Sequence, residues 1–332
     1  MHLETDDQKV SSLVSQAVEE IETYRDTKDT SVIRSASARL EAALVRDPEY
    51  LHALYYRGVA RDLLGHARDA IPDLERVLSA NPPFVNEVTY HLGVAYYHRY
   101  NRGCLEQAVE HLCAVTRGAS DPLLVIQARV VLTQAYAMMV IQPDPRAPHL
   151  DDARRCLDLC CEQYSTVVDA LNGLADFDRD LMVYREIEGT AENAKGMALM
   201  YSSDYFGVLS EKSAALYEAL GHLERADRGI PNDWANFCDR GSAHMRLGHW
   251  TAEATHFRQA LVLLERVVQA LRPGYGFALY EIGRTHRLMG RFDDALRYLD
   301  RAIEIPYEYR DVSDRRIDIE RERTAMRNTD FP

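Results

Sequence analysis

Three cysteines and a histidine form the first group of residues in this sequence that could bind a metal ion. Cys156, Cys160 and Cys161 follow closely after His149. Structural zinc sites usually draw on tightly spaced cysteine pairs of the C-x-x-C kind. Here the cysteines are spaced i, i+4 and i+5, as on one helix, and a free cysteine packs as a small apolar side chain. We therefore expect these side chains to pack in a helical core and to bind no metal.

A second candidate metal site is a run of alternating aspartates. Asp176, Asp178 and Asp180 are spaced like the first ligands of a calcium-binding loop. Such a loop also needs a glycine at its sixth position and a glutamate at its twelfth. Leu181 and Ile187 occupy these positions. The run therefore predicts a solvated turn and no calcium site.

The sequence contains no catalytic arrangement that we can identify. It has neither G-x-S-x-G nor H-E-x-x-H, and no strand-like segment leads into a glycine-rich phosphate loop. His244 and His286 lie on helix-like segments, and no acid or nucleophile is paired with them by spacing. We expect both to pack between helices. The prediction is therefore no enzymatic activity and no cofactor.

Charge and composition narrow the class of partner. The 332 residues include 39 Lys and Arg against 52 Asp and Glu, a formal net charge of −13. An acidic chain repels phosphate backbones, so we expect no nucleic-acid partner. The polar, acidic start is not typical of a signal peptide, and no run of about 18 apolar residues predicts a membrane span. Six cysteines are too sparse for a disulfide framework, so we expect a cytoplasmic protein.

The strongest pattern is an internal repeat. Pro48 and Pro82 end two similar apolar stretches that lie 34 residues apart. Steps of three and four between apolar residues trace one face of a helix. The apolar residues fall at the same offsets before both prolines: Leu40, Ala43 and Leu44, then Leu74, Val77 and Leu78. The pattern predicts repeated pairs of antiparallel helices.

One complete unit, from Leu51 to Pro82, resembles the tetratricopeptide repeat. The residues that carry this resemblance stand at repeat positions 8, 15, 20, 27 and 32: Gly58, Gly65, Ala70, Val77 and Pro82. In that family only small residues fit at positions 8 and 20, because the two helices cross there and a larger side chain would push them apart. The clearest further unit has Gly283 and Ala295 at these positions and ends at Pro306.

The resemblance implies an all-α fold, a right-handed superhelical solenoid of antiparallel helix pairs. We predict an N-terminal repeat block of about four helix pairs over residues 10–164 and a C-terminal block of longer pairs over residues 230–310. Residues 165–229 between them keep helical periodicity but match the repeat least. A polar capping helix is predicted over residues 311–328, because open solenoids need polar ends. Three prolines within 143–148 predict a loop.

The family resemblance also implies a binding surface. Positions 2, 5, 9, 12 and 13 of first helices line a concave groove that receives ligands in this family. Tyrosine, with 19 residues, offers such a surface a large area at low entropy cost. The residues predicted to bind a partner are His52, Tyr55, Asp62, Glu87, Tyr90, Tyr97, His98, Gln134 and Met138. Tyr55, Tyr90 and Tyr97 are the predicted anchors and should be only partly buried, although tyrosines at these positions are also ordinary packing residues of the repeat.

Function is predicted from this surface. The chain should be a protein-interaction module, a scaffold, adaptor or regulatory subunit that binds a peptide or protein in the groove. Val59 and Val94 stand at position 9, where the family's chaperone-tail clamp uses asparagine, so we expect no binding of that kind. Two alternatives remain open. One is a regulatory or catalytic subunit of an enzyme complex with its function in residues 165–229, and the other is a solenoid that assembles into homo-oligomers.

Overall fold

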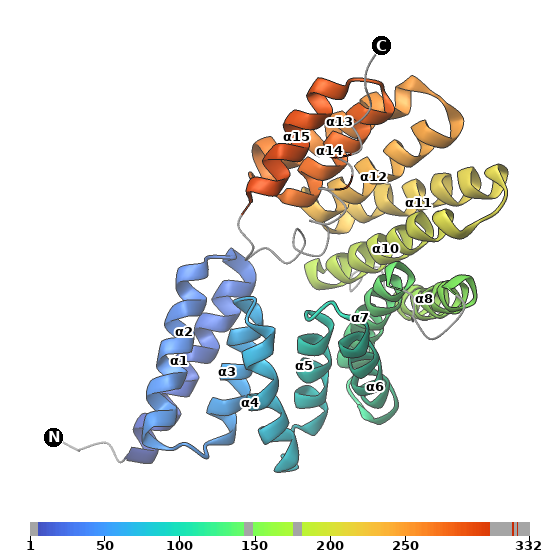
Figure 1. The fold of residues 1–332 in the computed structure, drawn as a ribbon. Coiled ribbons are helices and arrows are strands. Elements are labelled where there is room, and N and C mark those ends of the chain that lie inside the picture. Colours follow the sequence, from blue (N-terminus) through green and yellow to red (C-terminus); the bar gives the residue numbers. More distant parts are fainter. Residues whose placement is uncertain (1–5, 143–148, 175–180, 306–320, 322–323, 325–332) are drawn as a thin grey trace. The chain divides into compact units, whose positions relative to one another are not determined.

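The computed structural model describes residues 6–142, 149–174 and 181–305, together with residues 321 and 324. Within these residues the chain forms fourteen α-helices and no strand, which confirms the prediction of an all-α solenoid (Figure 1). It divides into two compact units, Met1–Pro148 (unit 1) and His149–Pro332 (unit 2), each with its own apolar core.

Unit 1 is a series of antiparallel helix pairs followed by a longer helix. In each pair the two helices pack against each other, and each pair packs against the next. Helix α7 (Pro122–Ile141) packs against α6 and α5. The pairs are α1 (Asp6–Thr27) with α2 (Thr30–Arg46), α3 (Leu51–Leu63) with α4 (Ala67–Ser79), and α5 (Val85–Tyr97) with α6 (Arg102–Gly118).

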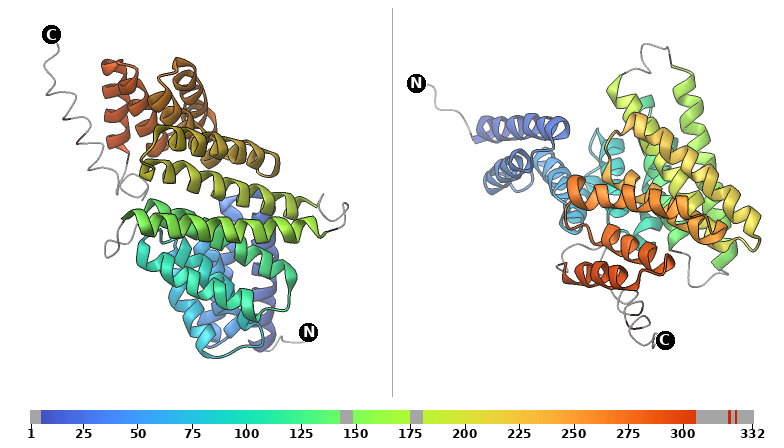
Figure 2. Two further views of the ribbon diagram at one scale, coloured as in Figure 1. Left: turned by 90° about the vertical axis from the view of Figure 1, so that its right-hand side faces the viewer. Right: turned by 90° about the horizontal axis from the view of Figure 1, so that it is seen from above.

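Unit 2 begins with α8 (His149–Asn172), which packs against α10 (Met182–Ser202). The 3₁₀ turn η1 (Ser203–Tyr205) follows α10. The π-helical turn η2 (Val267–Leu271) prolongs α13 (Ala254–Arg266), in the block where longer pairs were predicted. Helices α10 and α11 have 21 residues each, against 13 in α3 and α4, and lie side by side in Figure 2. The pairs are α10 with α11 (Leu209–Gly229), α12 (Trp234–Thr251) with α13 (Ala254–Arg266), and α14 (Gly276–Leu288) with α15 (Phe292–Glu304).

Glycine sets the turn inside two of these pairs. Gly65, after α3, and Gly290, after α14, have φ angles of 81° and 73°, a left-handed conformation that glycine adopts without steric penalty. Gly65, at repeat position 15, thus forms the turn between the two helices of the Leu51–Pro82 unit. Gly248 lies instead within α12, where an added Cβ would come 2.8 Å from the ring of Phe257. That pair turns later, at Ala252.

The helices of a pair cross where a leucine of the second helix lies over a glycine of the first. A Cβ atom on Gly58 would lie 2.8 Å from Cγ of Leu74, and a Cβ atom on Gly283 would lie 2.8 Å from Cγ of Leu299. Real Cβ atoms do not come that close, so an added methyl group would separate the helices. The same contact recurs in three further pairs: Gly93 with Leu112, Gly196 with Leu223, and Gly241 with Leu264.

First helices line the inner face of each unit. In unit 1, α3 contacts both α1 and α5, and α5 contacts α7. In unit 2, α12 contacts both α10 and α14. Among the described residues, the second helices α2, α4 and α6 make no contact of comparable extent with one another. Side chains that point away from the second helices therefore share a common inner face.

Some predictions about organisation stay predictions. The proline-rich loop within 143–148 and the capping helix over residues 311–328 lie outside the described residues, apart from residues 321 and 324. The division between the compact units falls at His149, ahead of the predicted block end at residue 164, because α8 packs against α10.

Among the described residues, only helix α7 is long and apolar enough to cross a membrane. Of its apolar window, 67% is buried inside the structure. A core helix passes the same test of length and composition, so this finding is weak evidence for a membrane span.

Enlarging the residue at a helix crossing should loosen the C-terminal pair. Ala295 is fully buried, and its carbonyl oxygen would lie 3.2 Å from a Cβ on Gly283. We expect Ala295→Leu to lower the free energy of unfolding by about 1–3 kcal/mol through overpacking. The exposed Arg291 provides the control, because Arg291→Ala should change stability by no more than about 0.5 kcal/mol. Equal melting temperatures for the two variants, followed by circular dichroism, would contradict the assigned crossing.

Candidate functional site

Two of the predicted groove residues contact each other on the inner face of unit 1. Asp62 lies in the last turn of α3, and His98 directly follows α5. Nδ1 of His98 lies 2.9 and 3.0 Å from the two carboxylate oxygens of Asp62. The side chain of Asp62 is 7% exposed and that of His98 is 37% exposed. Because a carboxylate only accepts hydrogen bonds, Nδ1 donates to it, and Nε2 is left to meet a ligand.

Tyr55 and Tyr97 are more buried than predicted. Each is 8% exposed. The ring centroid of Tyr55 lies 5.4 Å from that of Phe84 and 5.6 Å from that of His91, so aromatic side chains of the next hairpin cover it. The expectation that these two tyrosines are only partly buried is wrong. Replacing either one by alanine would remove core packing together with any ligand contact.

Tyr90 is the predicted anchor that is half-buried. Burial raises its pKa to about 12, and the charges of Arg25 in α1 and Asp62 in α3 are close enough to act on it. The phenol therefore stays protonated at neutral pH and can donate a hydrogen bond. Sequence reasoning missed Arg25, whose side chain is 44% exposed. It follows Tyr24, which stands where the repeat usually has glycine, so the repeat frame did not single it out.

The remaining predicted residues differ in accessibility. His52 and Glu87 are exposed, and Gln134 and Met138 of α7 are half-buried. The ring of His52 packs against Phe84 at 4.7 Å between centroids. Whether these side chains bind a partner stays a prediction.

His91 is half-buried beside Tyr55 and Tyr90, and it stays uncharged in the folded chain at neutral pH. Its ring centroid is 5.6 Å from that of Tyr55 and 5.1 Å from that of Tyr90. Burial, together with the positive charge of Arg25, lowers its pKa to about 4. An unfolded chain would titrate this histidine near its ordinary value of about 6.5.

Acid should therefore destabilise unit 1 through His91. Below about pH 6.5 the unfolded chain binds a proton that the folded chain does not, so stability falls as the pH drops toward 4 and then levels off. The slope is at most about 1.4 kcal/mol per pH unit. Thermal unfolding at pH 7.5 and 5.0 should show a smaller loss for His91→Gln than for wild type. The exposed His66 serves as control, and an equal loss in His66→Gln and His91→Gln would rule this explanation out.

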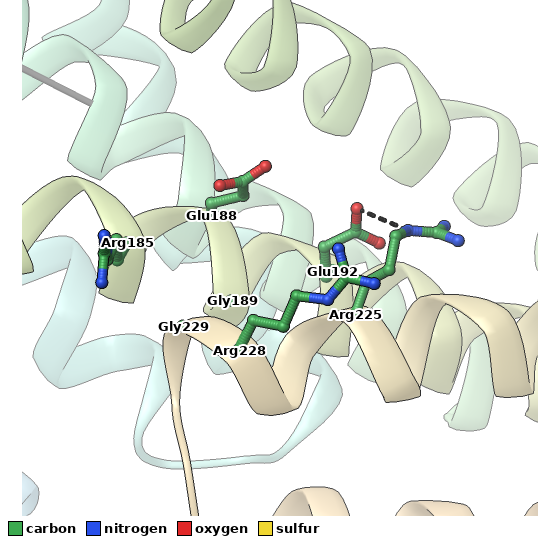
Figure 3. A pocket seen from close by; sticks show the side chains of 7 residues that line it. All are labelled: Arg185, Glu188, Gly189, Glu192, Arg225, Arg228 and Gly229. Carbon is green, nitrogen blue, oxygen red and sulfur yellow. Dashed lines mark hydrogen bonds and ion pairs between the residues drawn. The ribbon is translucent and has the colours of Figure 1, made fainter. Parts of the chain in front are cut away.

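A pocket of about 280 Å³ lies in the α10–α11 hairpin of unit 2 (Figure 3). Sequence reasoning named no residue there, although it kept residues 165–229 open as an alternative functional segment. The two helices approach closely at Gly189 and Gly229, where a Cβ on Gly189 would lie 2.9 Å from Cα of Gly229. The pocket is lined by Arg185, Glu188, Gly189, Glu192, Arg225, Arg228 and Gly229.

Glu192 holds three helices together at the edge of this pocket. It accepts hydrogen bonds from the Tyr164 hydroxyl of α8 at 2.8 Å, from Arg225 Nε of α11 at 3.0 Å, and from His222 Nδ1 of α11 at 2.5 Å. Figure 3 shows the link to Arg225. Burial by itself would raise the pKa of Glu192, but the three hydrogen bonds outweigh it and lower the pKa. The carboxylate is thus charged and already occupied, which makes its role structural.

Removing this charge should destabilise unit 2. Glu192→Gln keeps the shape of the side chain but leaves His222 and Arg225 without their anionic partner. We expect a loss of about 2 kcal/mol or more in the free energy of unfolding. Glu188 lies one turn earlier and is exposed, so Glu188→Gln should stay within about 0.5 kcal/mol of wild type. If thermal unfolding finds the two variants equally stable, the network does not hold the hairpin.

The candidate metal-binding cysteines pack in the core of unit 2. Cys156 and Cys160 are 1% and 0% exposed, and both are free thiols. For these two of the three cysteines, this confirms the prediction that they pack as small apolar residues, while Cys161 is half-buried. Across the described ranges, no three His, Cys, Asp or Glu residues form a metal-binding group. The His149 side chain and the run from Asp176 to Asp180 lie outside the described residues.

The two histidines that were predicted to pack between helices do so. His244 is 9% exposed, and its Nδ1 lies 3.0 Å from Nδ1 of His256. His286 is 6% exposed and stacks on Tyr298 with 5.6 Å between ring centroids. Neither histidine has a described hydrogen bond to a hydroxyl or thiol nucleophile.

Comparison with known proteins points to the same repeat. Models of the tetratricopeptide repeat match residues 64–119 and 278–309. No curated protein matches the sequence.

Solved structures give matches of low identity. The TPR2AB domain of yeast Sti1 in a pHSP90 complex is 13% identical, covers 96% of this chain and 100% of its own, and has a TM-score of 0.33. A monomeric IFIT1 mutant with Gppp-AAAA is 11% identical, and the match covers 83% of this chain and 68% of the mutant. Its TM-score is 0.44. The P58(IPK) TPR domain is 13% identical, and the match covers 92% of this chain and 97% of that domain. Its TM-score is 0.29.

The matched segments fall on helix pairs whose crossings have the small residues that the repeat requires. Residues 64–119 and 278–309 of this chain are tetratricopeptide repeats.

Proposed function

We propose that this chain is a scaffold, adaptor or regulatory subunit whose protein or peptide partner lies along the inner face of unit 1. Tetratricopeptide repeats in general support protein–protein interaction. The observation that carries the choice of face is the Asp62–His98 pair. A buried carboxylate fixes the orientation of a partly exposed imidazole, so the ring enters a complex with little loss of conformational freedom.

The chemistry of this face suits an extended polypeptide. Nε2 of His98 can exchange a hydrogen bond with a peptide group, and the Tyr90 hydroxyl can donate to a peptide carbonyl. His52 and Glu87 are exposed on the same two first helices. An aromatic ring with a polar tip beside a fixed hydrogen-bonding group is typical of the centre of a binding interface.

We propose no catalytic step at this pair. His98 is an acid–base group, but among the described hydrogen bonds none joins it to a hydroxyl or thiol. Its partner atoms are both oxygens of Asp62. A cytoplasmic location and a protein rather than nucleic-acid partner are parts of this proposal and rest on the charge of −13 and the reduced thiols.

Partner capture tests the proposal. The full chain is immobilised and used to capture partners from its native host, with mass spectrometry as the readout. The Tyr90→Ala, His98→Ala double variant should lose the specific partner, since a central anchor contributes about 2 kcal/mol or more, roughly thirtyfold in Kd.

Glu110, exposed on the second helix α6, provides the matched control. Glu110→Ala should capture the partner as wild type does, and circular dichroism should show that all variants are folded. If the folded double variant keeps its partner at wild-type affinity, the inner face of unit 1 is not the binding surface.

A further inference from the structure

Two buried histidines join the helices of the α12–α13 pair through a single hydrogen bond. Nδ1 of His244 in α12 lies 3.0 Å from Nδ1 of His256 in the first turn of α13, and the two rings stack with 5.2 Å between their centroids. The two residues are 9% and 8% exposed. A hydrogen bond between two Nδ1 atoms needs a proton on one of them and a free lone pair on the other.

The groups around the pair indicate which histidine donates. Nε2 of His256 lies 3.3 Å from the Tyr217 hydroxyl of α11 and 3.6 Å from a carboxylate oxygen of Glu253. A doubly protonated His256 would therefore still donate from Nδ1, while its Nε2 faces an acceptor. Among the described residues no carboxylate pairs with His244, and the guanidinium of Arg240, one turn earlier on α12, disfavours a positive charge on it. His244 is thus the acceptor, and the bond exists only while His244 is neutral.

The turn that joins α12 to α13 is strained and lacks a side-chain cap. Ala252, at the end of α12, has a φ angle of 59°, a left-handed conformation that is unfavourable for an L-residue. Glu253, at the start of α13, makes no capping hydrogen bond with its side chain. The first turn of α13 is held against α12 by the histidine bond and by the ring of Phe257, which packs over Gly248. Loss of the bond would therefore let this turn relax.

From this geometry we infer that the His244–His256 bond is an acid-sensitive latch on the α12–α13 turn. A proton on Nδ1 of His244 removes the lone pair that accepts from His256 and leaves two N–H donors facing each other. The latch then opens, the first turn of α13 separates from α12, and the ring of Phe257 becomes accessible to solvent. The latch belongs to unit 2, so it is independent of the partner surface proposed on unit 1.

The pH range in which the latch opens follows from the cost of charging His244. Burial, and then the charges of His256 and Arg240, lower the pKa of His244 to about 4, whereas in the opened turn it returns to about 6.5. Because the open state binds the proton more tightly, opening becomes more favourable as the pH falls below about 6.5 and levels off below about 4. Between pH 7 and pH 5 these two pKa values predict a roughly twentyfold increase in the opening equilibrium.

Amide hydrogen exchange of the full chain at pH 7 and pH 5, read by mass spectrometry and corrected for the intrinsic exchange rate, tests the latch. In the wild type, amides of residues 256–259 should lose about twentyfold in protection at pH 5, while those of α15 should keep theirs. His244→Asn should lose less than about twofold, because the amide oxygen accepts the bond and takes up no proton. His249, exposed on the same helix, provides the matched control, and His249→Asn should lose protection as the wild type does.

Nitrogen-15 NMR of the histidine-labelled wild type gives a second readout, which decides the matter if circular dichroism shows that His244→Asn is unfolded. At pH 7 it should find Nδ1 of His244 without a proton and Nδ1 of His256 with one, and the reverse arrangement would overturn the inference.

Three results of the exchange experiment would also overturn it. The first is equal protection of residues 256–259 at both pH values in the wild type. The second is an equal loss in the wild type and in folded His244→Asn. The third is an equal loss in α15, which would mean that acid unfolds unit 2 as a whole instead of opening one turn.

Discussion

The contact between a leucine of the second helix and a glycine of the first is the constraint on which this structure depends. Because Cγ of Leu74 and of Leu299 would lie 2.8 Å from a Cβ on Gly58 and Gly283, only the absence of a side chain lets the paired helices approach. Among the described helices, the pairs α3–α4, α5–α6, α10–α11, α12–α13 and α14–α15 all have this contact. Helices α7 and α8 lie in different units and are not among these pairs. The crossing sets the distance and angle within a pair, and the stacking of pairs then brings first helices together.

The stacking of first helices forms the inner face. What a side chain on this face can do depends on how deeply it is buried. Some side chains of first helices, such as Tyr55 and Tyr97, are buried, and Phe84 and His91 of the next hairpin cover Tyr55. Those farther out, such as Tyr90 and His98, keep a polar tip within reach of a ligand. Asp62 joins the two levels, because its carboxylate is buried while the imidazole that it orients is not. The same repeat position therefore supplies either core packing or a binding group, according to what the adjacent hairpin places over it.

The α10–α11 pair departs from the repeat in length but not in packing. Gly196 lies under Leu223, as Gly58 lies under Leu74, yet the leucine follows its glycine by 27 residues in one pair and by 16 in the other. The added turns carry the Gly189–Gly229 approach, the Glu192 network and the exposed residues at the hairpin end. These three features thus lie in the pair whose helices are longer than the repeat requires.

The sequence by itself determined the helical pairs, the turn at Gly65 and the small residues at the crossings, because these follow from local periodicity and from the size of one side chain. It also placed Asp62, Tyr90 and His98 on one face through their repeat positions. Only the tertiary structure decided that Asp62 and His98 form a pair, that Tyr55 and Tyr97 are covered, and that Glu192 joins α8, α10 and α11. Those outcomes depend on contacts between residues far apart in the chain, and no fixed spacing encodes them once helix lengths vary from 13 to 24 residues.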